Sequence, residues 1–172
     1  MKLKINPQAK NKVVLLIGLI FILTVSSCVS PHYRQDKSHE PPGKFEPIPI
    51  ERANGIFATI GYSPSSDYTD IELETEPAIT PGDIKEIRKS FLYSGTYAKI
   101  ELELTQEGAR KFHMLTKENI GKPIAIVVDN QKVGMPMVMA AIVEGRVSIA
   151  GGYAEDEIDR LIKILKEEIS QQ

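Results

Sequence analysis

The sequence of 172 residues predicts an α+β domain, in which a mixed or antiparallel sheet carries helices packed on one face. Three patterns lead to this fold class. Residues 68–76 and 96–104 alternate apolar and polar side chains, which is typical of strands with one buried and one solvated face. Residues 106–119 and 154–170 repeat apolar side chains at helical spacing. Residues 123–129 are almost continuously apolar and predict a central strand that is covered on both faces.

In chain order, the first predicted elements are strands at 55–62 and 68–76, joined by the turn sequence SPSSD. A short helix through IKEIRKSF is expected next. Thr80 is a favourable N-cap for it, Pro81 suits the first helical position, and Asp83 suits the positive end of the helix dipole.

After the strand at 96–104, Thr105 is expected to cap a helix that ends near Asn119, because Gly121 and Pro123 stop it. The central strand then follows, and its turn begins at Asn130.

The last part of the chain is expected to contain a strand at 133–143, a turn at Glu144–Gly145 and a strand within RVSIAGG. The closing helix, 154–170, places its apolar residues on one face. On its polar face we expect an ion pair between Asp156 and Arg160, worth a few tenths of a kcal/mol.

The first 27 residues have the pattern of an export signal. A basic start without acidic residues precedes Val13–Val25, a run in which only two residues are not strongly apolar. A membrane-spanning helix needs about 20 such residues, so this shorter run favours a signal peptide. Ser26 and Ser27 follow and precede Cys28, the only cysteine. The sequence LTVSSC resembles the lipobox of bacterial lipoproteins.

In that family the cysteine sulfur is lipidated and the signal is cleaved before it. We therefore expect residues 1–27 to be removed and Cys28 to anchor the mature chain to a membrane, with several acyl chains making the attachment stable. An Asp after the cysteine retains such proteins in the inner membrane, whereas Val29 and Ser30 stand here. The resemblance thus implies a periplasm-facing protein of the outer membrane. An ordinary secretory signal with an incidental cysteine is the alternative.

Residues 28–52 predict a semi-rigid tether, because they hold five of the eleven prolines. The folded domain is then expected at 53–172. His32 and His39 lie in the tether and are too isolated to predict a metal site. Without residues 1–27 the chain has 17 basic and 23 acidic residues, a net charge of −6, which argues against nucleic acid as a partner.

The predicted domain shows no arrangement typical of an active site. His113 is its only histidine, and no glycine-rich loop has the spacing that cradles phosphate. Glu101 and Glu103 lie on the polar face of a predicted strand. We therefore expect no catalysis, no cofactor and no small-molecule substrate, with an unrecognised hydrolase as the distant alternative.

The sequence IELELTQEGARKFHMLTKENIGKPIAIVVDNQKV, followed by MPMVMAAIVEGRVSIAGGYAEDEIDRLIKIL, resembles the head subdomain of the first periplasmic domain of SecD, the export-motor subunit. The resemblance covers about residues 53–170 and implies the α+β fold of that head. The positions that match the family pattern are Leu104, Thr105, Glu107, Gly108, Ala109, Phe112, Leu115, Thr116, Asn119, Gly121, Ala125, Ile126, Val127, Asp129, Pro136, Gly145, Arg146, Ile149 and Gly151.

The sequence also departs from the family. Asn130 stands where the family has Gly, and Ala154 stands where it has Ser or Thr, which removes a cap worth about 1 kcal/mol. Gly134 and Met135 replace small residues. The membrane helices that hold the family's proton-flow residues do not occur in these 172 residues, so we do not expect this chain to act alone as a proton-driven motor.

Met135, Met137 and Met139 alternate around Pro136 and are expected on one side of an edge strand. Thioethers adapt to many partner shapes, and a sheet edge can pair with an extended peptide. Because the SecD head is implicated in holding emerging polypeptide, these four residues are candidate peptide contacts. Packing in the core is the alternative for the methionines.

For the whole protein, the resemblance implies non-catalytic binding of unfolded polypeptide or of a protein partner, linked to protein export. The alternative is a structural envelope lipoprotein that binds one fixed partner and has no part in export.

Overall fold

The computed structural model describes residues 46–92 and 97–171. The expected signal peptide, Cys28 and most of the expected tether lie outside these residues. The chain divides into two compact units, 1–38 and 39–172, and all described residues belong to the second unit.

Five strands form one sheet, in which every neighbouring pair is antiparallel. From one edge to the other, its strands are β1 (Ile48–Pro49), β7 (Gln131–Gly134), β6 (Ile124–Val128), β2 (Gly55–Ile60) and β3 (Glu72–Leu73). The pairing of β1 with β7 brings the end of the expected tether into the sheet. The expected strand at 68–76 is reduced to the two residues of β3.

A second antiparallel sheet has three strands, in the order β4 (Ile84–Leu92), β5 (Tyr97–Leu104) and β8 (Arg146–Ile149). The described residues also form two helices, α2 (Gln106–Glu118) and α3 (Glu155–Ile169). The α+β class is confirmed, but the strands are divided between two sheets.

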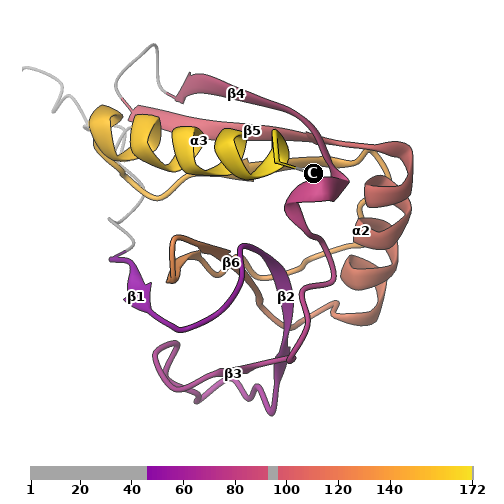
Figure 1. Cartoon of the computed structure of the whole chain (residues 1–172). Helices are drawn as coiled ribbons and strands as arrows, with labels where there is room; N and C mark the ends of the chain where they lie inside the picture. Colours follow the sequence, from indigo (N-terminus) through magenta and orange to yellow (C-terminus); the bar gives the residue numbers. More distant parts are fainter. Residues whose placement is uncertain (1–45, 93–96, 172) are drawn as a thin grey trace, which may run out of the picture. The chain divides into compact units, whose positions relative to one another are not determined.

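Helix α3 runs along β4 and β5, as Figure 1 shows, and packs against both strands. It buries Ile158, Leu161 and Leu165. Helix α2 begins directly after β5 and buries Phe112 and Leu115. Both helices contribute to the main core on the apolar side of the three-stranded sheet, whose other face is polar.

Every residue of β6 is buried, which confirms the prediction of a central strand covered on both faces. Ile124, Ile126 and Val128 join the main core with the two helices. Ala125 and Val127 face the other way, into a small second core around Phe57.

The short helix predicted after Thr80 was wrong. Pro81–Asp83 form only a 3-10 turn, and the residues that follow are strand β4. Ile84 and Ile87 lie three residues apart, which is helical spacing, but a β-bulge between Ile84 and Glu86 brings both side chains to the buried face. Pairing with β5 over eight positions outweighs the weak local helix signal.

The strand predicted at 133–143 was also too long. Strand β7 ends at Gly134, and beyond it only Met137 makes an isolated bridge, to Pro123. Pro136 explains the break because it has no N–H for a ladder.

The ion pair expected between Asp156 and Arg160 is replaced by one between Arg160 and Asp129. Ala154 indeed supplies no side-chain cap to α3, but the carboxylate of Glu157 accepts a hydrogen bond from the Ala154 N–H at 2.9 Å.

Candidate functional site

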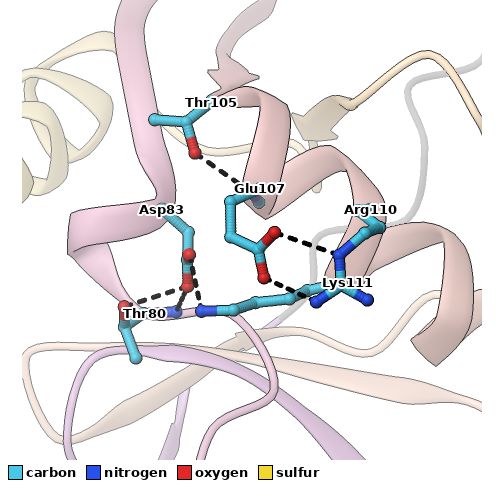
Figure 2. A network of polar contacts seen from close by, with 7 residues as sticks. Thr80, Asp83, Thr105, Glu107, Arg110 and Lys111 are labelled. Carbon is cyan, nitrogen blue, oxygen red and sulfur yellow. Dashed lines mark hydrogen bonds and ion pairs between the residues drawn. The ribbon is translucent and has the colours of Figure 1, made fainter.

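Asp83 lies at the point where the chain passes from the five-stranded sheet to the three-stranded sheet. Its side chain is buried, and both of its oxygens accept hydrogen bonds (Figure 2). Oδ2 accepts bonds from the Thr80 N–H at 2.9 Å and the Thr80 hydroxyl at 3.0 Å. Oδ1 accepts a bond from the Lys111 Nζ at 2.8 Å. The carboxylate thus ties the start of β4 to helix α2.

Burial by itself would raise the pKa of the Asp83 carboxyl. The hydrogen bonds from Lys111 and Thr80 oppose this effect and prevail, so the pKa lies below its ordinary value. The group is therefore a charged structural link at neutral pH.

The backbones of Asp83 and helix α2 are also in direct contact at this junction. The Thr105 N–H donates to the Asp83 carbonyl at 2.8 Å, and the Thr105 hydroxyl accepts from the Gly108 N–H at 3.0 Å, so Thr105 caps α2 as predicted. A Cβ on Gly108 would lie 2.5 Å from the Asp83 carbonyl oxygen. Only glycine fits there without a shift. Glu107, by contrast, lies at the surface and pairs with Arg110 at 2.6 Å (Figure 2).

Of the other family-motif positions proposed for the site, Asp129, Gly145 and Gly151 lie between the strands and helices, and Arg146 begins β8. Asp129 adopts a left-handed conformation, with φ of 56°, in the β6–β7 turn, and its N–H donates to the side chain of Asn54 at 2.8 Å. Gly145 has φ of 62°, and a Cβ on it would lie 2.6 Å from the Cβ of Ala109. Gly151 is buried before α3, whereas Arg146 is exposed at the start of β8.

Sequence reasoning assigned Asp83 to a helix start and missed its role in this junction. The signal was present, because Thr80 and Asp83 have the three-residue spacing of a capping box. That spacing could not predict the bond to Lys111, which lies 28 residues further along the chain.

Lys132 was also missed. Its side chain is buried and its Nζ donates to the carbonyls of Tyr68 and Thr69, at 3.2 and 3.1 Å. Burial lowers the pKa of this ammonium group, against the opposing field of Asp70 and Asp67. The bonds hold the β2–β3 connection against β7.

A groove of about 380 Å³ opens between α2 and strand β8. One wall is Phe112 and Thr116 of α2, another is the segment 136–142, and the third is formed by residues 146–148 of β8. The Ile142 N–H donates to the Thr116 hydroxyl at 3.0 Å, so the segment is attached to the helix at one end. The lining is mostly apolar, as a site for an apolar side chain requires.

The four candidate peptide contacts do not lie on one side of a strand. Met135 is buried in the second core, against Phe57 and Val127, as the packing alternative held. Pro136, Met137 and Met139 line the groove, and Met139 is 82% exposed. The placement therefore separates Met135 from the other three.

The rim of the groove is unusually apolar. Met139 is flanked along the chain by Val143, 66% exposed, and the Gly121 N–H donates to the Val138 carbonyl at 2.8 Å. That bond brings the exposed Ile120 close to the same segment. Met139 is the large exposed apolar side chain among the groove-lining residues, and Ile120 and Val143 are exposed in adjoining segments. An exposed apolar side chain beside an apolar hollow is typical of an interaction site.

The described residues contain no group of three metal-ligating side chains. His113 Nδ1 is buried and has no hydrogen-bond partner within residues 46–92 and 97–171. In the same part of the chain, no helix is long and apolar enough to cross a membrane.

Comparison with known proteins identifies the fold. The model of the family "SecDF, P1 head subdomain" matches residues 59–168. The chain is 33% identical over 90 residues to protein translocase subunit SecDF of Thermus thermophilus, covering 52% of this chain and 12% of that protein. It is 35% identical over 95 residues to SecD of Elusimicrobium minutum, covering 55% and 20%. For SecD of Acidaminococcus fermentans the identity is 31% over 110 residues, covering 64% and 26%.

Two solved structures have the same fold. A structure of SecDF, described as a membrane component that enhances protein export, superposes with a TM-score of 0.51 at 27% identity, over 70% of this chain and 60% of that one. SecDF in its super-membrane-facing form gives a TM-score of 0.51 at 26% identity, over 70% and 18%. The chain spans only 12% to 26% of the length of the three curated relatives. With most of its described residues matched by the family model, the chain belongs to the SecDF P1 head subdomain family.

Proposed function

We propose that this chain is a membrane-anchored, periplasm-facing domain that binds unfolded polypeptide or a protein partner without catalysis, in support of protein translocation. Its relatives are named protein translocase subunits, which supports the link to export. In the proposal the chain contributes a docking surface, and the energy for transport comes from other proteins.

The observation that carries this function is the apolar groove between α2 and β8. Its hollow accepts apolar side chains, and Met139 at its rim offers a flexible thioether to partners of different shapes. The junction around Asp83 is closed and fully bonded, so it offers no comparable opening.

Anchoring is the second part of the proposal. Lipid on Cys28 would hold the domain at the envelope, and the proline-rich residues that follow would act as a spacer. The outer membrane is the proposed location because Val29 and Ser30 follow the cysteine in place of Asp.

The binding role can be tested with Met139→Asp in the full chain. The probe is a reduced and carboxymethylated protein that stays unfolded, and its affinity is measured by fluorescence anisotropy. Loss of one apolar side chain from an interface predicts about tenfold weaker binding. Phe91→Asp is the control, since Phe91 is an exposed apolar residue of β4, 46% exposed, that does not line the groove. Equal loss in both variants, or no binding by the unaltered chain, would contradict the proposal.

Anchoring is tested separately by mass spectrometry of the native protein and by membrane fractionation. We expect an acylated amino-terminal cysteine in the outer-membrane fraction and release of a Cys28→Ser variant into the soluble fraction. An unmodified thiol on the native chain would overturn this part and leave the binding test untouched.

A further inference from the structure

The free edge of β8 is defined by its pairing with β5. The Leu104 N–H donates to the Gly145 carbonyl at 2.9 Å, so these two residues form a hydrogen-bonded pair. In an antiparallel ladder such pairs alternate with pairs whose N–H and C=O groups point away from each other. The register Glu103↔Arg146 and Glu101↔Ser148 therefore turns the backbone groups of Arg146 and Ser148 away from β5.

These outward groups lie at the groove. Residues 146–148 form one of its walls, and β8 has no strand neighbour other than β5 among the described residues. A strand edge with free N–H and C=O groups can form hydrogen bonds with the backbone of another polypeptide segment. The groove beside it accepts apolar side chains. Together these two features describe an extended polypeptide segment.

We propose that such a segment adds to β8 as a fourth, antiparallel strand of the three-stranded sheet. This inference rests on the proposed binding function and specifies how the polypeptide is held. The hydrogen bonds run between the segment and the backbones of Arg146 and Ser148, and they are independent of the segment's sequence.

The pleat of the sheet fixes which side chains enter the groove. Arg146 and Ser148 are exposed, whereas Val147 and Ile149 are buried. Directly opposed residues in an antiparallel pair share a face. Residues of the segment that bond to Arg146 and Ser148 therefore point to solvent, and the residues between them point toward the groove.

Charge adds a preference at one position. Arg146 is exposed and lies opposite Glu103 on β5, and its charge contributes to the lowered pKa of that carboxyl. Its other neighbouring position, on the free side of β8, has no strand partner among the described residues. An acidic residue opposite Arg146 would form a favourable cross-strand pair. The favoured segment alternates apolar residues with polar ones and carries an acidic residue beside Arg146.

The test uses the full chain and a fluorescent synthetic peptide in which valine alternates with polar residues around a central glutamate. One version carries N-methyl groups on the polar residues, including the glutamate, and a second carries them on the valines. N-methylation of the polar residues removes the donors that face β8, so we expect about tenfold weaker binding or more. N-methylation of the valines should leave the affinity within about twofold of the unmodified peptide.

The possible results separate the two proposals. If both N-methylated versions bind as well as the unmodified peptide, strand addition is wrong and the apolar groove stands. If the unmodified peptide and the carboxymethylated protein both fail to bind, the proposed function itself is wrong.

A substitution on the domain gives an independent measurement. Ser148→Pro removes one N–H from the free edge, where proline is tolerated in strands. We expect this variant to lose the peptide with little change in its unfolding temperature, while Ser148→Thr binds normally. Arg146→Glu should reverse the preference at the central position from glutamate to lysine, without depending on the folding of the proline variant. Retained preference for glutamate in Arg146→Glu would contradict the assigned register.

Discussion

Two regions of this domain differ in how many of their polar groups already have hydrogen-bond partners. They are the junction around Asp83 and the groove between α2 and β8. At the junction, a buried carboxylate accepts three hydrogen bonds, and the backbones of Asp83 and α2 are in direct contact. At the groove, backbone groups of a strand edge face an apolar hollow with the exposed Met139 at its rim. In the first region both carboxylate oxygens already accept hydrogen bonds from the same domain, whereas the second region can still form interactions with another chain.

This difference changes how the family pattern is understood. Thr105 and Gly108 belong to the junction, and Asp129 and Gly145 set turns. These residue types are needed because the backbone approaches closely or takes a left-handed conformation. The pattern therefore mainly encodes the fold. Four positions of the family pattern also line the groove: Phe112, Thr116, Pro136 and Arg146.

The largest effect is expected from closing the space at the junction with Gly108→Val. Its Cβ would lie 2.5 Å from a backbone oxygen, which a rotamer change cannot relieve. We expect a loss of about 3 kcal/mol in the free energy of unfolding, measured by chemical denaturation. Gly134→Ala is the control, because a Cβ there would lie at an ordinary 3.6 Å from Ile126. Equal stability of the two variants would show that the junction is not tightly packed.

A smaller loss, about 2 kcal/mol, is expected for Asp83→Ala, since hydrogen bonds to a charged group are removed. Asp159→Ala removes an exposed carboxylate that pairs with Lys89 and should change stability by less than about 0.5 kcal/mol. The lowered pKa of Asp83 also predicts that its contribution is present near neutral pH and is lost as the pH falls below about 4. The free energy of unfolding of both variants, measured as the pH is lowered, checks this. If Asp83→Ala lost as much stability in acid as the unaltered chain, Asp83 would not be the charged link proposed here.

Tyr153 is a second buried side chain whose polar group has a partner. Its hydroxyl donates a hydrogen bond to the Val133 carbonyl. Tyr153→Phe leaves that carbonyl without its partner and should cost about 1 kcal/mol at neutral pH. Burial, together with the charge of Glu157, raises the pKa of Tyr153 to about 12, compared with 10.0 for a free tyrosine. The unfolded chain therefore loses the phenolic proton first, and stability falls as the pH rises from about 10 to about 12.

Thermal unfolding at a series of alkaline pH values measures this fall. Tyr153→Phe should show a shallower decline over the same window, because the titrating group is absent. A decline as steep as that of the unaltered chain would mean that Tyr153 titrates normally in the folded state.

The smallest effect on stability is expected at the groove rim. Met139 is 82% exposed, so Met139→Ser should change the free energy of unfolding by less than about 0.5 kcal/mol. Met135→Ser, in the second core, should cost about 2 kcal/mol or more, because a buried thioether is lost. If the two variants were equally destabilised, Met139 would belong to the core and the contrast between the regions would fail.

Local patterns in the sequence were sufficient for several elements. The helix capped by Thr105, the central strand β6 and the final helix each follow from periodicity and flanking residues. Strand β4 could not be predicted in this way, because a bulge gives its buried isoleucines the spacing of a helix. The prediction of a strand up to residue 143 gave too little weight to Pro136, beyond which only an isolated bridge forms.

The candidate site was found only in part. The methionine-rich segment drew attention to Met137 and Met139, which do line the groove, but the segment is not a continuous strand. The other walls come from α2 and β8, which precede and follow this segment in the chain. The link between Asp83 and Lys111 was missed for the same reason, because its partners are 28 residues apart.

The sequence alone determined the α+β class, the helix capped by Thr105 and the family resemblance, since each depends on patterns of residues along the chain. The lipid anchor at Cys28 is a prediction from the same kind of local pattern. Only the tertiary structure decided that the strands form two sheets, that Asp83 is a buried link and that β8 presents a free edge beside an apolar groove. Those features depend on contacts between distant segments, and the free energy of such contacts arises from burial and backbone pairing that no local pattern contains.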